Sequence, residues 1–350
     1  MAFLAGAPCV SRTDLPDLSR TWAVLLAGGE ATRLHELSAI EAKPALPIAG
    51  RRLADFAVAS AVEAGLPRLL GLLGPRPGLL SRHLADLWGD RISLVLRMQD
   101  APDTLTALAR ARPDLDEADV DRLVILPADQ VQAIDLRALL ASHMAQGAPA
   151  TLASTGPVVL ERRLLSEVAD AAQGDIWNDV LPRLANRDLL ARWSPPQGTH
   201  LRDIDTLDDL REASLGLQRG ALGALLPGNE VIPLDDSCDL AFETGGIALS
   251  VPRFGARQPG RWTVLEDTLV MPGARVAPGA RLTRAIVAPG AIVPAGLVVG
   301  EDPSEDARWF RVTPGGTTLL TPPMLAARAA ERMRARLRPR PPAGLAHSGS

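Results

Sequence analysis

The stretch that decides the fold is WAVLLAGGEATRLHELSAIEAKPALP, residues 22–47. Its first six residues, 22–27, form a continuous apolar run, which is typical of a strand buried on both faces. Gly28 and Gly29 follow at once. Glycines directly after such a strand let the backbone approach a phosphate group and point N–H groups at it. The stretch therefore predicts a phosphate-binding loop at the carboxyl end of a buried strand.

Outward from this stretch, apolar runs and helical segments alternate along the chain. The apolar runs that predict buried strands lie at residues 69–73, 92–96, 122–127 and 150–154. The helical segments lie at residues 53–65, 79–88 and 136–144. The alternation predicts an α/β domain with a doubly wound, mostly parallel sheet. Ligands bind at the carboxyl ends of the strands of such a sheet. The glycine loop and Asp129 fall at such ends, and Asp203 closes a further short strand.

The C-terminal part has a different texture. Pro-Gly-Ala turns alternate there with short apolar segments, and apolar residues recur every six positions at Val264, Val270, Val276 and Leu282. Short strands separated by such turns predict a small parallel β-helix whose coils stack on one another. We therefore expect an α/β domain over residues 18–220, a β-helix over 221–323, and a basic helix with a disordered tail over 324–350.

Composition limits the classes of function. The 350 residues carry a net charge of −4, with a pI near 5.8, whereas a nucleic-acid-binding protein carries a basic domain. No apolar run approaches the roughly 18 residues of a membrane-spanning helix, and the opening residues lack the basic start of a signal peptide. The two cysteines, Cys9 and Cys238, predict reduced thiols rather than a disulfide framework. We expect a cytoplasmic protein that binds neither membrane nor nucleic acid.

One detail of the composition points back to the glycine loop. Of 37 basic residues a single one, Lys43, is lysine. Arg33 in the loop and Lys43, ten residues later, supply two cations for a polyphosphate, and arginine cannot simply replace lysine at a tight phosphate site. Asp129 and Asp203 add two carboxylates, which together with phosphate oxygens usually hold Mg²⁺. The residues predict a site for a polyphosphate and a magnesium ion.

Four segments of the chain carry a resemblance to a known family: residues 23–66, 127–154, 201–217 and 264–310. They resemble the bacterial ADP-glucose pyrophosphorylases, also called glucose-1-phosphate adenylyltransferases. The last segment, with Gly300-Glu301 and Glu305-Asp306-Ala307-Arg308, is similar to that family in particular. The glycine loop with its Arg-Leu and Lys-Pro pairs is shared by all sugar nucleotidyltransferases.

The resemblance implies a reaction in which ATP and glucose 1-phosphate give ADP-glucose and pyrophosphate for glycogen or another α-glucan. It implies that Asp129 and Asp203 hold Mg²⁺, and that Arg33, Lys43 and Asp129 carry the catalysis. The implied nucleotide-binding residues are Ala27, Gly28, Gly29, Thr32, Arg33, Lys43 and Thr104. It also implies that the β-helix is left-handed and serves assembly and regulation, with homotetramers usual.

Several positions depart from the family pattern. Ala31 stands where the family loop has a third glycine, and a left-handed conformation there would cost alanine about 1 kcal/mol. Of the family's Gly-Thr-Ala-Asp motif near the base and ribose, only Thr104 survives, and Gly-Asp-His around the metal-binding aspartate has become Ala128-Asp129-Gln130. Ile40-Glu41 replaces the family's basic pair for a sugar-phosphate activator. We expect that form of regulation to be absent.

The largest departure is a deletion. The family carries a Phe-Gly segment and a Glu-Lys-Pro motif, whose lysine binds the sugar phosphate, where this chain passes from Ser154 straight to Val158. No second lysine exists to replace it. Arg162 or Arg163 can supply the charge, although not the shape, of that lysine.

Three functions are compatible with these residues. The chain is an active, trimmed pyrophosphorylase, or it is a non-catalytic homologue that binds nucleotide or regulates a complete pyrophosphorylase subunit in a hetero-oligomer. The β-helix alone is also typical of hexapeptide-repeat acyltransferases. Those enzymes generally use a histidine base on the repeat domain, and no histidine occurs between His200 and His347.

Overall fold

The computed structural model describes residues 17–29, 31–48, 50–75, 78–118, 120–154, 156–165, 173–196, 201–218 and 263–337. The chain divides into two compact units, residues 1–236 and 237–350, and each is described by itself. The predicted domain boundary at residues 220 and 221 and most of the predicted tail lie outside the described residues.

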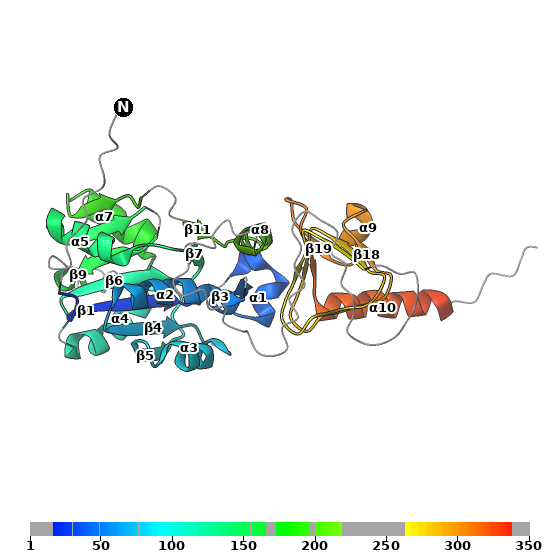
Figure 1. Ribbon diagram of the computed structural model, residues 1–350, viewed down its shortest axis with the longest axis horizontal. Helices are drawn as coiled ribbons and strands as arrows, with labels where there is room; N and C mark the ends of the chain where they lie inside the picture. Colours follow the sequence, from blue (N-terminus) through cyan, green and yellow to red (C-terminus); the bar gives the residue numbers. More distant parts are fainter. Residues whose placement is uncertain are drawn as a thin grey trace, which may run out of the picture. The chain divides into compact units, whose positions relative to one another are not determined.

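The first unit is built on a seven-stranded sheet with the order β10-β8-β9-β6-β1-β4-β5 (Figure 1). Its strands are β1 (Thr21–Ala27), β4 (Arg68–Leu73), β5 (Ser93–Met98), β6 (Arg122–Pro127), β8 (Ala150–Ala153), β9 (Val158–Glu161) and β10 (Leu190–Trp193). Only β9 runs antiparallel to its neighbours in this sheet. The predicted α/β fold with a mostly parallel sheet is confirmed.

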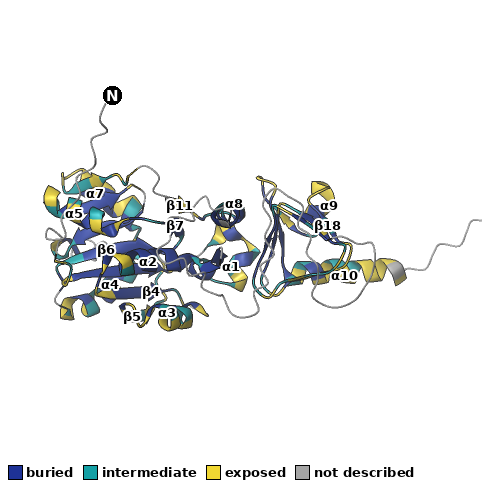
Figure 2. Cartoon of the chain, in the orientation of Figure 1, coloured by how far each residue is buried: buried dark blue, intermediate teal, exposed yellow. Residues whose placement is uncertain are grey.

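Helices cover both faces of this sheet, and β1 shows why its sequence is apolar throughout. Ala23, Leu25 and Ala27 face one core cluster, which includes side chains of α2, α3 and α5. Trp22 and its alternate neighbours face a second cluster, with α4 and α7. Figure 2 shows the central strands buried and the helices exposed on their outer sides. The helices of the unit are α1 (Glu36–Ile40), α2 (Leu53–Ala64), α3 (Leu80–Trp88), α4 (Thr104–Glu117), α5 (Leu136–Gln146), α7 (Leu181–Ala185) and α8 (Leu207–Gln218).

Short elements at the carboxyl edge of the sheet position the loops. The strands β7 (Gln130–Gln132) and β11 (Leu201–Asp203) pair antiparallel, with Gln130 opposite Asp203. A second small pair joins β2 (Pro47–Ile48) to β3 (Arg51–Arg52). Short turns of helix occur at η1 (Thr32–Leu34), η2 (Lys43–Ala45), η3 (Arg162–Leu164) and η4 (Ile176–Val180). The pairing of β7 with β11 brings two distant parts of the chain to the same place, because backbone bonds fix their register.

Glycines end two of the helices of this unit, and polar side chains begin two others. Gly65 and Gly147 end α2 and α5 in the left-handed conformation, with φ of 75° and 64°, which favours glycine because it lacks a Cβ atom. Thr206 and Asp209 cap α8 reciprocally: the Asp209 N–H donates to the Thr206 hydroxyl, and Asp209 accepts from the Thr206 N–H. The Asp103 carboxylate accepts from the Thr106 N–H at 2.7 Å and begins α4.

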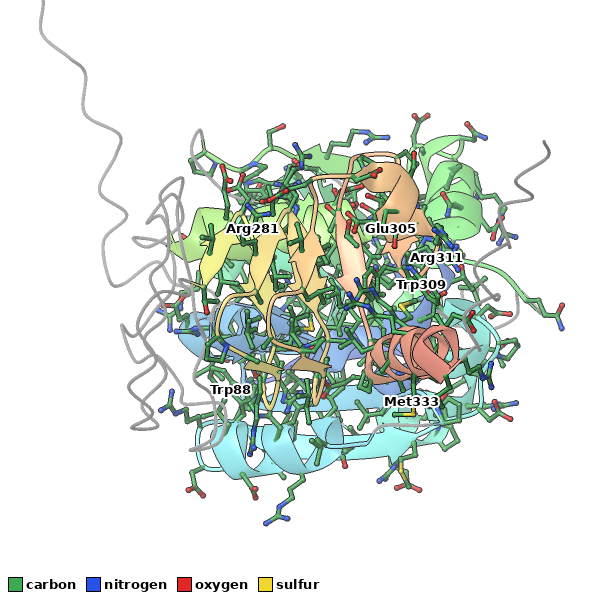
Figure 3. The ribbon with its side chains drawn as sticks, turned by 90° about the vertical axis from the view of Figure 1, so that its right-hand side faces the viewer. Trp88, Arg281, Glu305, Trp309, Arg311 and Met333 are labelled. Atoms are coloured by element: carbon green, nitrogen blue, oxygen red, sulfur yellow. The ribbon has the colours of Figure 1, made fainter. Side chains whose placement is uncertain are left out.

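The second unit is a parallel β-helix, as predicted. Val264 pairs with Arg281, and Arg281 with Val298, so that successive coils stack in register. Figure 3 shows these strands side by side, with α10 seen end-on. Its elements are β12 (Val264–Glu266), β13 (Leu269–Val270), β14 (Arg275–Val276), β15 (Arg281–Thr283), β16 (Ala285–Val287), β17 (Ile292–Val293), β18 (Val298–Val299), α9 (Pro303–Ala307), β19 (Arg311–Val312), β20 (Thr318–Leu320) and α10 (Pro322–Leu337). Apolar side chains fill the interior of the coils, because the six-residue period turns one residue of each segment inward.

Candidate functional site

A cavity of about 830 Å³ opens at the carboxyl ends of the strands of the first unit. Residues at the ends of β1, β4, β6, β8 and β10 line it. Three of its apolar residues, Leu26, Leu72 and Leu152, belong to the core cluster that includes α4. The cavity therefore lies on the α4 side of the sheet, where a ligand site is expected in a fold of this kind.

The structure brings most of the predicted site residues together in this cavity. Gly28, Gly29, Thr32, Arg33, Lys43, Thr104, Asp129 and Asp203 all line it. Ala27 does not: it is buried at the end of β1, where its carbonyl accepts the N–H of Gly74 at 3.3 Å. Ala27 thus fixes the end of the strand from which the glycine loop departs.

The backbone of the loop explains which of its positions need glycine. Gly29 has a φ of 109°, which an L side chain rarely adopts. Ala31 has a φ of −83°, so the position that carries the family's third glycine imposes no left-handed cost here. The strained residue is His35, with φ 51° and ψ −133°. It separates the turn that presents Arg33 from α1.

Two cations and two carboxylates form a chain of ion pairs at the glycine-loop end of the cavity. The Lys43 ammonium lies 2.9 Å from Asp129 Oδ2 and 3.1 Å from Asp205 Oδ1. The other oxygen of Asp205, Oδ2, lies 3.0 Å from Arg33. The side chain of Lys43 is only 11% exposed, whereas that of Arg33 is 69% exposed. The single lysine therefore lies inside the site, between two acids.

Asp203 stands beside this group of charges. Its carboxylate accepts from the Gln130 side-chain amide at 2.6 Å, across the β7–β11 pair. The Ile204 N–H donates to the Asp129 carbonyl at 3.1 Å, which fixes the two acids side by side. Partial burial of the carboxyl group raises the pKa of Asp203, and the negative charges of Asp129 and Asp205 raise it further.

The acids fit a divalent cation that is completed by a substrate. No group of three His, Cys, Asp or Glu side chains among the described residues is arranged to hold a metal ion. Mg²⁺ commonly takes one or two carboxylates and obtains its other ligands from water and from phosphate oxygens. Asp129, directly before β7, and Asp203, at the end of the paired strand β11, supply that number of carboxylates. The donor set suits a hard cation shared with a phosphate.

At the far side of the cavity, Thr104 holds the segment that precedes α7. Its hydroxyl donates to Asp175 Oδ2 at 3.2 Å and accepts from the Ile176 N–H at 3.1 Å. Asp175 Oδ1 in turn accepts from the N–H groups of Trp177 and Asn178, both at 2.9 Å. Thr104 lines the cavity, but its hydroxyl bonds to Asp175 and Ile176 and so helps to fix the neighbouring Trp177 and Asn178 in the cavity lining.

The structure does not place Arg162 or Arg163 where the missing lysine would act. The Arg162 guanidinium donates to the carbonyls of Ala118 and Asp116, and Arg163 lines a separate small pocket near His143. Neither lines the main cavity. Neither is placed to supply the charge of that lysine, because β9 runs antiparallel and carries both residues to the opposite edge of the sheet.

Sequence analysis missed several residues that line the cavity: Asp175, Trp177, Asn178, Arg192 and Asp205. Asp205 had a usable signal, because it follows Asp203 by two residues at the end of a strand. Arg192 and the segment before α7 had none, since a four-residue edge strand and a short helical turn leave little periodicity in the sequence.

Comparison with known proteins assigns both units. Residues 22–163 match the nucleotidyl transferase family, and residues 253–320 match the GlmU-like C-terminal hexapeptide family. A structure from Bacillus anthracis assigned as a glucose-1-phosphate thymidylyltransferase superposes with a TM-score of 0.52 at 16% identity, covering 61% of this chain and 98% of that one. None of the helices in the described ranges is both long and apolar enough to cross a membrane.

The fold and the family match make residues 22–163 similar to the nucleotidyltransferase domains. Relatives that match over nearly the whole chain are more specific. The glucose-1-phosphate adenylyltransferase of Jannaschia sp. is 26% identical over 89% of this chain and 97% of its own length. That of Thiobacillus denitrificans is 25% identical over 89% and 93%. The chain is therefore a divergent relative of the bacterial glucose-1-phosphate adenylyltransferases, which confirms the resemblance seen in the sequence.

Proposed function

We propose that this protein is an ADP-glucose pyrophosphorylase that joins ATP and glucose 1-phosphate into ADP-glucose and releases pyrophosphate. The observation that carries the proposal is the meeting, in one cavity, of the Gly28-Gly29 loop, the single lysine of the chain and both predicted acids. Relatives of that name match over nearly the whole chain. Nothing in the cavity favours the acyltransferase alternative.

The side chains present suit phosphoryl chemistry. An oxygen of the sugar phosphate attacks the α-phosphorus of ATP in line, and the bond to the β-phosphate bridging oxygen breaks. The nucleophile is already anionic near neutral pH and pyrophosphate leaves as an anion, so the reaction needs positioning and charge stabilisation rather than a general base. In agreement, no histidine is among the described residues that line the cavity, although aspartates and three cations are.

Each part of the glycine-loop end has a role in this reaction. The N–H groups that follow β1 and the Arg33 and Lys43 side chains bind the phosphates of ATP. Because both cations pair with Asp205, ATP has to replace a carboxylate with phosphate oxygens. Lys43 then faces the α-phosphate while still close to Asp129.

Charge balance supports a metal ion at this end. Among the described residues, the cavity is lined by five aspartates and three cationic side chains. The net charge of this lining is negative, so it would repel ATP. Mg²⁺ held by Asp129 and Asp203 would offset this repulsion and supply charge stabilisation at the α-phosphate and at the departing pyrophosphate. The raised pKa of Asp203 agrees with a carboxyl group that lacks a cationic partner of its own.

Release of pyrophosphate tests the proposal. Purified protein with Mg²⁺, ATP and glucose 1-phosphate should release pyrophosphate and form ADP-glucose, and omission of any one of the three should stop both. Asp129→Asn should lower turnover at least about 100-fold, since it removes a charge that acts at the reacting phosphate. Asp86→Asn, which alters an exposed carboxylate paired with Arg82 on α3, is the matched control and should leave turnover unchanged.

The same experiment separates the enzyme from a non-catalytic homologue. A protein that binds ATP with Mg²⁺ but releases no pyrophosphate would be a nucleotide-binding regulatory subunit. If a complete pyrophosphorylase is then added, a change in its turnover would support that alternative.

We further propose that the protein acts in the cytoplasm as an oligomer and supplies activated glucose for an α-glucan. The absence of a disulfide framework in the sequence supports the proposed location. The β-helix, which the resemblance implies serves assembly, supports the proposed oligomer. Light scattering of the purified protein coupled to size exclusion tests it: a mass equal to one chain would contradict an oligomer.

A further inference from the structure

The cavity contains a third cation that differs from the other two in its partners. Arg33 and Lys43 are paired with aspartates. Arg192 lines the same cavity, but its guanidinium makes no hydrogen bond or ion pair with another residue in the described part of the chain. A guanidinium that faces a ligand cavity without a carboxylate is free to bind an incoming anion.

The sheet places Arg192 on the cavity face. It lies on β10, the edge strand, and pairs in register with Leu152 of β8. Paired residues of neighbouring strands point to the same face of a sheet, and Leu152 lines the cavity. Alternation along β10 agrees, because Leu190, two residues earlier, packs on the core cluster of that same face.

The position of β10 separates Arg192 from the glycine loop. In the order β10-β8-β9-β6-β1, the strand that leads to Asp129 is three strands away and the strand that leads to Gly28 is four. At the usual strand spacing, β10 is about 14 Å from β6. A long side chain on β10 covers part of this distance. A ligand that lies between β10 and the two acids would therefore meet Arg192 on one side and the glycine-loop end on the other.

Two further residues that line the cavity suit the binding of a sugar. Trp177 and Asn178 line the same cavity as Arg192, and their backbone is fixed by the Asp175 carboxylate. The Trp177 indole N–H donates to the Gly156 carbonyl at 3.0 Å, which ties the ring to the short β8–β9 turn. An aromatic ring with a few polar groups is the usual lining of a pocket for a small ligand.

We propose that Arg192 is the residue that binds the phosphate of the sugar 1-phosphate, in place of a lysine that this chain lacks. The assignment rests on the proposed function and adds the residue that selects the second substrate. The short turn between β8 and β9 leaves no room for a longer phosphate-binding segment there. Arg192 enters the cavity from the next strand and supplies the charge.

Binding measurements test this assignment without relying on turnover. We expect Arg192→Ala to weaken the binding of glucose 1-phosphate about 10- to 100-fold by calorimetry, since charged hydrogen bonds are lost. ATP with Mg²⁺ and unphosphorylated glucose should bind Arg192→Ala as they bind the wild type. Arg192→Lys should recover part of the affinity, because it restores the charge but not the planar fork. Arg82→Ala, on α3, is the matched control and should change none of these.

The outcomes separate this assignment from the proposed reaction. If the wild type turns over and Arg192→Ala leaves both the affinity and the KM for glucose 1-phosphate within about twofold, the assignment is wrong and the reaction stands. If glucose 1-phosphate binds through Arg192 but no pyrophosphate is released, the assignment stands and the reaction fails. If the wild type binds no glucose 1-phosphate at millimolar concentration, the assignment is overturned. The thermal stability of Arg192→Ala should equal that of the wild type, which shows that a loss of binding is not a loss of fold.

Discussion

The two ends of the cavity balance their charges in different ways. At the glycine-loop end, Arg33 and Lys43 are held by Asp129 and Asp205. At the β10 end, Arg192 faces the cavity without a carboxylate partner among the described residues. At the glycine-loop end, a ligand phosphate has to displace aspartates of the protein from the two cations. At the β10 end, an anion can bind Arg192 without displacing a carboxylate.

This difference predicts that ATP needs a divalent cation to bind and that glucose 1-phosphate does not. ATP at the glycine-loop end competes with Asp205 and meets the negative charges of Asp129 and Asp203, so its affinity depends on a divalent cation. A sugar phosphate at the β10 end displaces no carboxylate. We therefore expect chelation of the metal to remove ATP binding while glucose 1-phosphate still binds.

The largest expected effect comes from the single lysine. Lys43→Met removes the cation between Asp129 and Asp205, and loss of a charged hydrogen bond of about 1.5–3 kcal/mol predicts a fall of roughly 10- to 150-fold in ATP affinity. Calorimetry with Mg²⁺ and ATP measures this fall. Lys43→Arg is the informative control, because it keeps the charge but not the compact shape and should recover only part of the affinity. Unchanged ATP affinity in Lys43→Met would place the nucleotide elsewhere.

Asp205 should have the opposite effect. Asp205→Asn removes the carboxylate that competes with phosphate for Arg33 and Lys43. Two partly exposed ion pairs contribute about 0.2–1 kcal/mol each, so ATP should bind roughly 2- to 30-fold more tightly. Binding of glucose 1-phosphate should not change, since Arg192 has no part in these pairs. Weaker ATP binding in Asp205→Asn would mean that Asp205 holds the metal instead of competing with the nucleotide.

A smaller effect, on stability, comes from Asp203. Burial raises its pKa above the ordinary value of 3.8, so the folded protein favours the neutral carboxyl. The stability that follows is present below the unfolded pKa and is lost as the pH rises through the raised folded pKa. Asp203→Asn, which stays neutral, should therefore be slightly more stable than the wild type at pH 7, by less than about 1 kcal/mol because the carboxyl group is only partly buried. Thermal unfolding should show this difference shrink towards about pH 4. A difference that does not change with pH would assign it to another cause.

The smallest effects come from two strained residues, one at each end. His35 follows the glycine loop with a φ of 51°, and Ser154 ends β8 on the cavity wall with a φ of 50°. Glycine adopts such angles without the cost of about 1–2 kcal/mol that other residues carry, although it loses more freedom on folding. His35→Gly and Ser154→Gly should each raise the free energy of unfolding by about 0.5 kcal/mol in urea titrations. Lower stability in either variant would show that its side chain holds the loop.

Much of the glycine-loop end was predictable from the sequence, for a physical reason. The buried strand before Gly28, the strand before Asp129 and the short strand that ends at Asp203 each leave a strong local pattern. The carboxyl ends of parallel strands meet at one edge of the sheet. Local patterns and this one rule of topology were enough to predict that Arg33, Lys43 and the two acids lie in one site.

The β10 end was not predictable in the same way. Its key residue lies on a strand of four residues at the edge of the sheet, and the wall opposite is a short helical turn held by Thr104. From the sequence, Arg162 and Arg163 were named as residues that can supply the charge of the missing lysine. The antiparallel direction of β9 carries them to the other edge. Direction of a single short strand is decided by long-range pairing, which local residues do not encode.

The reverse reaction tests most directly whether both ends of the cavity serve one reaction, because ADP-glucose has to occupy both ends at once. With ADP-glucose, labelled pyrophosphate and Mg²⁺, the wild type should form labelled ATP and glucose 1-phosphate. Lys43→Met and Arg192→Ala should each lower the rate, through different ends of the cavity. A folded protein that binds ADP-glucose but never forms labelled ATP, or that does not bind it, would contradict the account.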